Sequence, residues 1–200
     1  MKINKTLISL LLLLPVFLVS CASNTVVMKP GYDFSKIKRI AVIEFRNSAY
    51  YPNSGSMVSQ LFAKYMLKAG YNVIERDELE ALLRERQLST ANLLEPSTVL
   101  NYGKLLGIDA IVTGSIPMVV PEQNFYDMGN PRFIAAQVGV TARMISVETG
   151  EVLWVGSDTY DAVNTQTAFE YLVSSLVSQL IEGLKDSVRK NKTVINDSVR

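Results

Sequence analysis

The chain has very few side chains that could carry out covalent or metal chemistry. It contains one cysteine, Cys21, and no histidine in 200 residues. Without imidazole or a second thiol, the common zinc ligands, the most frequent acid–base catalyst and an internal disulfide are all missing. Only carboxylate, lysine, serine or tyrosine chemistry would remain. The sequence therefore predicts a protein that is not an enzyme and that uses no metal and no cofactor.

The other polar motifs do not form a catalytic pattern. Glu44, Glu75 and Asp77 fall near the ends of expected strands, but no histidine or nucleophile accompanies them. We interpret these carboxylates as helix caps and surface charges. Gly114 and Ser115 lack the Gly-x-Ser-x-Gly pattern of a nucleophile elbow, and no glycine pattern for phosphate binding is present. No small-molecule substrate is expected.

Cys21 follows a segment typical of a secretory signal. Two early lysines precede an apolar run over residues 7–19, which Pro15 interrupts. This run is shorter than the roughly 20 apolar residues that a spanning helix needs. The sequence Leu-Val-Ser-Cys at 18–21 resembles the bacterial lipobox, which implies lipidation of Cys21 and cleavage before it. The alternative is a cleaved signal with an incidental cysteine.

The mature chain is expected to sit on a membrane through acyl chains on Cys21. Cleavage removes Lys2 and Lys5 and leaves 18 basic and 19 acidic side chains, so no electrostatic case for nucleic acid exists. No aspartate follows Cys21, which by resemblance to enterobacterial sorting implies the outer membrane, facing the periplasm. Each buried methylene contributes about 0.8 kcal/mol to anchoring.

The chain divides into four segments. We expect a signal peptide over 1–20, a lipidated tether over 21–36, one α/β domain over 37–188 and a polar tail over 189–200. The tether lacks the long Pro/Ser/Gln-rich linker that would carry a domain far across the periplasm, so the domain should lie close to the membrane.

The first half of the domain alternates strands and helices. Short apolar runs rich in β-branched residues predict strands over 39–45, 71–75 and 109–116. Apolar residues at helical spacing predict helices over 57–69 and 96–106, and a further helix that begins near Asp77.

The second half is predicted as a hairpin followed by a helix. A period-two strand covers 134–144, Gly150 supplies a turn, and a partner strand covers 152–160. A helix with apolar residues at steps of three and four then runs to Leu184, with a capping box formed by Thr167 and Glu170.

Four segments in this order, behind the lipobox, resemble the family of the curli-secretion lipoprotein CsgG and the holdfast protein HfaB. They are residues 73–77, 82–86, 106–116 and 147–153. The resemblance implies an α/β three-layer sandwich with a mixed sheet flanked by helices, and a core like the TolB N-terminal domain. It also implies that the protein assists assembly or export of surface fibres or adhesins, through association with copies of itself or with other envelope assembly proteins.

The chain departs from that family at its membrane-spanning hairpins. Family members carry two such hairpins, and a spanning strand needs about 9–11 residues. Here the first slot, 117–132, contains three prolines and several charges, and the second slot, 161–165, is only a few residues long. We therefore expect that the protein does not form a pore alone.

Two groups of apolar residues in loops are candidate interfaces. Tyr50 and Tyr51 lie in the loop over 46–55, and Phe125, Tyr126 and Met128 lie in the first hairpin slot. Aromatic residues concentrate at interface anchors, although each group could instead pack over its own domain. An alternative function is activation of a cell-wall synthase from the outer membrane, against which the missing long linker argues.

Overall fold

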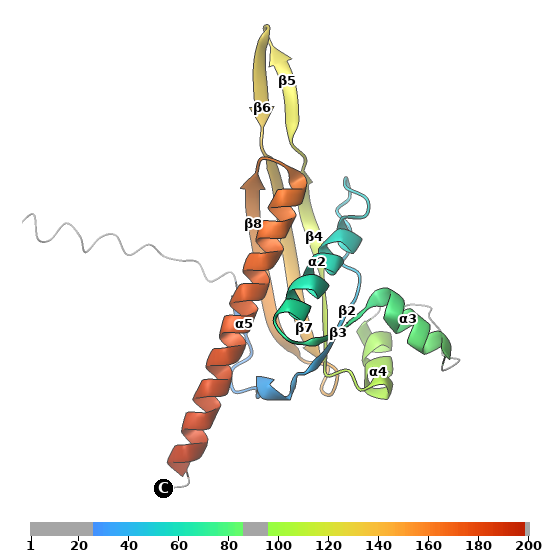
Figure 1. Cartoon of the computed structure of the whole chain (residues 1–200), viewed down its shortest axis with the longest axis vertical. Coiled ribbons are helices and arrows are strands. Elements are labelled where there is room, and N and C mark those ends of the chain that lie inside the picture. The colour runs from blue at the N-terminus through green and yellow to red at the C-terminus, as the bar shows by residue number, and fades with distance from the viewer. Residues whose placement is uncertain (1–25, 86–95, 199–200) are drawn as a thin grey trace, which may run out of the picture.

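The computed structural model describes residues 26–85 and 96–198, which form a mixed α/β fold (Figure 1). Its strands are β1 (Val26–Met28), β2 (Arg39–Val42), β3 (Asn72–Glu75), β4 (Ala110–Val120), β5 (Gln123–Asp127), β6 (Asn130–Ile134), β7 (Ala136–Ser146) and β8 (Val152–Ala162). Its helices are η2 (Phe34–Lys36), α2 (Ser54–Lys68), α3 (Arg76–Glu85), α4 (Pro96–Leu106) and α5 (Thr165–Ser198).

Six strands form one mixed sheet in the order β1-β8-β7-β4-β2-β3. The β2 strand pairs in parallel with β3 and β4, because helical crossovers separate these strands in the chain. The β7, β8 and β1 strands continue the sheet in antiparallel fashion. The predicted mixed sheet with flanking helices is confirmed.

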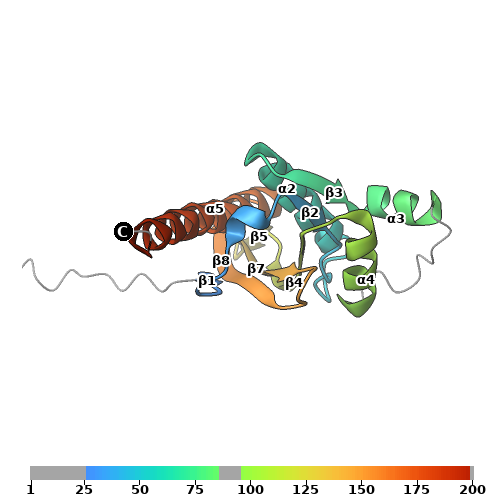
Figure 2. The same cartoon turned by 90° about the horizontal axis from the view of Figure 1, so that it is seen from below.

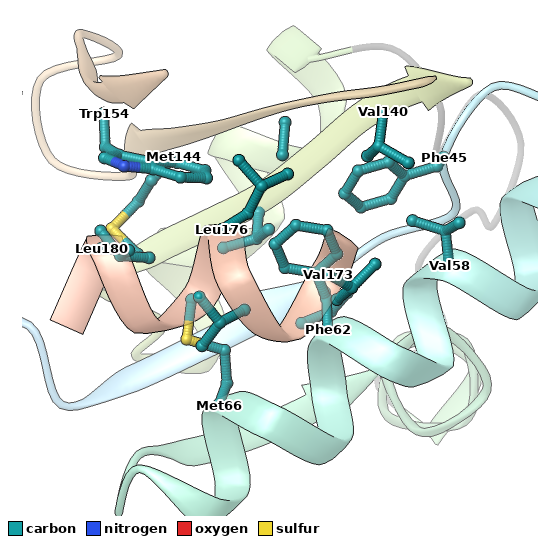
Figure 3. Close-up of a cluster of buried hydrophobic side chains, with 14 of the residues drawn as sticks. Phe45, Val58, Phe62, Met66, Val140, Met144, Trp154, Val173, Leu176 and Leu180 are labelled. Atoms are coloured by element: carbon teal, nitrogen blue, oxygen red, sulfur yellow. The ribbon is translucent and has the colours of Figure 1, made fainter. Parts of the chain in front are cut away.

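The main core lies between the sheet and the two helices α2 and α5 (Figure 3). Phe45 stacks on Phe62 of α2 with ring centroids 4.9 Å apart, and Trp154 of β8 lies against α5. The period-two residues of β7 from Ala136 to Met144 are all buried on this face, as their alternation predicts.

A second, smaller core lies on the other face of the sheet, under α3 and α4. Its buried residues come from the parallel strands, the two helices and the segment after β7: Ala41, Ile43, Ile74, Leu79, Leu83, Leu106, Ile108, Ile111 and Val147. The molecule is therefore three-layered only at its parallel half. Figure 2 shows α2 and α5 on one side of the sheet, and no described helix covers the opposite side of β7 and β8.

The β1 strand belongs to the folded domain, so its residues are not part of the tether expected over 21–36. Val26, Val27 and Met28 pair with Gly156, Val155 and Trp154 of β8. The Met28 side chain packs against α5, where Gly183 leaves room for its sulfur. A three-residue strand is too short for its periodicity to be recognised.

The last helix begins earlier and ends later than its pattern indicates. Asn164, not Thr167, is the cap, because its side-chain oxygen accepts the Thr167 backbone N–H at 2.8 Å. The helix then runs to Ser198, through the segment expected as a polar tail. No glycine or proline follows Gly183, so nothing in the backbone chemistry stops it. None of the described helices is long and apolar enough to cross a membrane.

The segment after β4 forms a short hairpin that projects beyond the sheet (Figure 1). The β5 and β6 strands pair over five residues each and form a two-stranded sheet of their own. Proline is tolerated there because both strands are edges, and Pro131 pairs with Tyr126. Only Val163 and Asn164 separate β8 from α5, which leaves no room for a second hairpin.

Candidate interaction site

The β5–β6 hairpin ends in a two-residue turn at Met128 and Gly129. Both residues have positive φ, 48° and 82°, which matches the twist of the flanking strands. Glycine adopts this conformation freely, whereas an unbranched apolar residue such as methionine rarely does. The Met128 side chain is 97% exposed. The turn therefore holds a large apolar side chain at the tip, entirely in solvent.

The hairpin exposes apolar side chains along its whole length. All ten residues of its two strands are exposed, and Tyr126 is 79% exposed. Besides the predicted Phe125, Tyr126 and Met128, the structure adds Phe133 and Ile134 to this group. A two-stranded ribbon with no packed face is marginally stable in water, so such a ribbon gains from contact with lipid or protein.

Glu122 holds the base of the hairpin against the first turn of α5. Its carboxylate accepts hydrogen bonds from the backbone N–H and the hydroxyl of Thr165, at 3.0 and 2.7 Å. The hydrogen bond from the Thr165 hydroxyl, followed by backbone hydrogen bonds, holds the pKa of Glu122 below its ordinary value. Because negative charge is favoured at a helix N-terminus, the position suits a carboxylate.

The loop between β2 and α2 contains two adjacent tyrosines, of which one is exposed and the other packs on the core. Tyr50 is 91% exposed, whereas Tyr51 packs on the core with its ring 6.5 Å from that of Phe169. Side-chain hydrogen bonds fix the loop: Asn47 Oδ1 accepts the Gly55 N–H at 2.7 Å, and Ser54 Oγ accepts the Ser48 N–H. The loop thus presents Tyr50 outward on a rigid support.

The three carboxylates near the strand ends line one pocket. Glu44, Glu75 and Asp77 line it together with Glu80 and residues of α2, and its volume is about 250 Å³. Among the described residues, no group of histidine, cysteine or carboxylate side chains could hold a metal ion. Cys21, the predicted lipidation site, lies outside the described residues.

Comparison with known proteins gives one family and several similar folds. The model of the family described as curli production assembly/transport component CsgG matches residues 32–196. No curated protein matches the chain.

Solved structures with a similar fold include the following three. Two structures of the PelC dodecamer from Paraburkholderia phytofirmans each have a TM-score of 0.54 and cover 76% of this chain. The first, a single-residue variant, is 16% identical to this chain, and the match covers 96% of the PelC chain. The second is 15% identical, and the match covers 92% of the PelC chain. Lipoprotein GNA1162 from Neisseria meningitidis is 20% identical, with a TM-score of 0.49, over 72% of this chain and 99% of that chain.

Proposed function

Because the chain belongs to the CsgG family, we propose that it is an outer-membrane lipoprotein that assists assembly or export of surface fibres or adhesins. Acyl chains on Cys21 anchor it, and the domain faces the periplasm. It acts by association with copies of itself, or with other envelope assembly proteins, rather than by catalysis.

The agreement between the tether length and the hairpin position carries this proposal. Val26 is the fifth residue after Cys21, so the chain between them can span at most about 17 Å. Val26 pairs with Gly156, six residues before Ala162 at the end of β8. At about 3.3 Å per residue, the base of the hairpin lies about 20 Å farther along the sheet. The two lengths are similar, so we propose that Cys21 is anchored near the level of the hairpin base.

In that arrangement the exposed hairpin enters the lipid. Tyr126, Phe133 and Met128 would sit in the interface and the outer part of the acyl layer, where aromatic residues are favoured. Its five-residue strands are about half as long as a spanning strand. The hairpin then adds a second membrane contact without forming a pore alone.

The short tether also bears on the alternative function. An activator of a cell-wall synthase must reach across the periplasm to the peptidoglycan, and a reach of about 17 Å keeps this domain at the membrane. Self-association is favoured instead by the fold shared with PelC, which forms a dodecamer.

Two measurements test the proposal. The particle mass of the detergent-extracted lipoprotein should correspond to many copies, and a strict monomer at micromolar concentration would contradict self-association. For the membrane contact, Met128→Cys provides a single reactive thiol, because the sulfur of the lipidated Cys21 is in a thioether bond. A fluorophore there should be quenched by nitroxide-labelled lipid and protected from aqueous iodide.

Lys104→Cys is the matched control for the quenching experiment. Lys104 is exposed on α4, at the far end of the sheet from the hairpin (Figure 1). A fluorophore there should respond to iodide and not to the labelled lipid. Equal responses at the two positions would contradict insertion of the hairpin.

A further inference from the structure

One half of the sheet has a face that no described helix covers. We define the open face as the outward side chains of β1, β7 and β8, with their neighbours on β4. Along β8, Val155, Ser157, Thr159 and Asp161 are all exposed, whereas Trp154 and Gly156, on either side of Val155, are buried against α5. Val27 of β1, 67% exposed, pairs with Val155 and extends the same face.

The part of the open face that is farther from the β5–β6 hairpin carries two arginines. Arg143 is exposed on β7, and its row across the sheet runs through Val27, Val155 and Thr113. Arg46 forms a parallel bridge with Ser115, so it joins the neighbouring row with Thr141. Within the described part of the chain, neither guanidinium has an ion-pair partner. The flat surface of small side chains around them makes a basic, sterically open platform.

The opposite edge of the sheet is acidic. The edge strand β3 ends at Glu75, and the pocket beside it is lined by Glu44, Glu75, Asp77 and Glu80. Glu75 and Asp77 are exposed. An edge strand also presents unpaired backbone groups, which favour contact with another chain.

The basic and acidic surfaces lie at the same height along the strands. Glu75 pairs with Val42, Val42 pairs with Val112, and Val112 pairs with Met144, the neighbour of Arg143. Along the strand direction, Arg143 is thus offset by one residue, about 3.3 Å, from the row that contains Glu75. In a ring whose axis follows the strands, rotation between copies keeps this height, so these two surfaces face each other at every junction.

We propose that the open face of one copy, with Arg46 and Arg143, packs against the acidic β3 edge of the next copy. This inference rests on the self-association proposed above and names its interface. The contact is head-to-tail, because the open face of one copy meets a different surface, the β3 edge, on the next copy. Head-to-tail contacts generate rings when the rotation closes.

A charge exchange tests this interface on the detergent-extracted lipoprotein. Arg143→Glu and Glu75→Arg should each weaken assembly by about tenfold or more, since like charges then face each other. The double variant, which carries both substitutions, restores one attractive pair at every junction and should recover the wild-type particle mass. Lys68→Glu, an exposed charge change outside both surfaces, should leave that mass unchanged. Unchanged far-ultraviolet circular dichroism spectra of the singly substituted chains would exclude misfolding, since weaker assembly by itself lowers the unfolding midpoint.

Disulfide trapping provides the second readout. In one copy, Glu75 and Arg143 are separated by three strand spacings, about 14 Å, whereas a disulfide needs Cα atoms within about 7 Å. The chain with Glu75→Cys and Arg143→Cys should therefore form only links between copies, seen as a ladder of dimers, trimers and larger species.

The outcomes separate this interface from the proposed function. Rescue by the double variant, with a disulfide ladder, supports the interface. An assembled wild type that tolerates Arg143→Glu and forms no ladder overturns the interface and leaves self-association standing. A monomeric wild type overturns self-association, and this interface with it.

Discussion

At the residue scale, Glu122 is the clearest electrostatic contact of the candidate site. We expect Glu122→Gln to lower the midpoint of thermal unfolding at neutral pH, because an amide replaces a carboxylate that accepts two hydrogen bonds from Thr165. The folded-state pKa of Glu122 is lowered, so its contribution is complete above the ordinary carboxyl pKa and disappears as pH falls through the folded-state value.

The pH dependence separates this contact from a general effect of substitution. Unfolding midpoints of two Cys21→Ser chains, with and without Glu122→Gln, should converge below the ordinary carboxyl range. A difference in midpoint that stays constant into acid would show that the Glu122 charge is not responsible.

Gly114 has a packing role that its sequence context does not reveal. A Cβ at this position would lie 2.0 Å from the Thr141 carbonyl oxygen and 2.5 Å from Cε1 of Phe45. We therefore expect Gly114→Ala to lower the free energy of unfolding by about 1–3 kcal/mol. Ser115→Ala, at a partly buried neighbour, should stay within about 0.5 kcal/mol. Urea unfolding of both variants checks this, and equal stabilities would refute the steric account.

Single residues in loops are the least predictable from sequence. Tyr50 and Tyr51 are adjacent and chemically identical, yet one is exposed and one packs on the core, because no periodicity operates in a loop. Phe133 and Ile134 were not recognised as part of the exposed group. The pairing of β5 with β6 places Phe133 on the face of the hairpin that carries Tyr126 and Ile134 on the face that carries Phe125. The turn at Met128 is the signal that could have found them.

At the element scale, the cap of α5 distinguishes two interpretations of the same sequence. Asn164→Ala removes the side-chain acceptor of the Thr167 N–H and should destabilise the domain by about 1 kcal/mol. In a domain of this size that shift corresponds to about 2–4 °C in the midpoint. Thr167→Ala should change stability by less than about 0.5 kcal/mol. A larger effect for Thr167 in calorimetry would favour the capping box over the observed cap.

The strands and helices with strong periodicity were predicted correctly, and their ends were not. The alternation over 134–144 predicts β7, because one face is buried under α5 and the other is open. The β1 strand carries no such signal in three residues, and its place in the sheet depends on a distant partner, β8. The extension of α5 to Ser198 depends on the absence of a stop signal, which periodicity does not report.

At the scale of the whole molecule, the layers follow from the pattern of the strands. Parallel strands buried on both faces require helices on both sides, which explains why α3 and α4 cover only the parallel half of the sheet. The alternating strands β7 and β8 need only one covered face, and this leaves the open face. Sequence alone therefore predicts the core of the molecule, whereas the height match between Arg143 and Glu75 emerges only from strand register.

The hairpin is structurally separable from the domain that carries it. Its ten strand residues are exposed and contribute nothing to either core, while Glu122 lies outside it, at its base. We expect that replacing residues 124–133 by Asn-Gly changes the unfolding midpoint of the Cys21→Ser chain by no more than about 2 °C, since no buried surface is lost. The same replacement should abolish sedimentation of that chain with outer-membrane lipid vesicles. Loss of folding would contradict separability, and undiminished sedimentation would mean that another surface contacts the lipid.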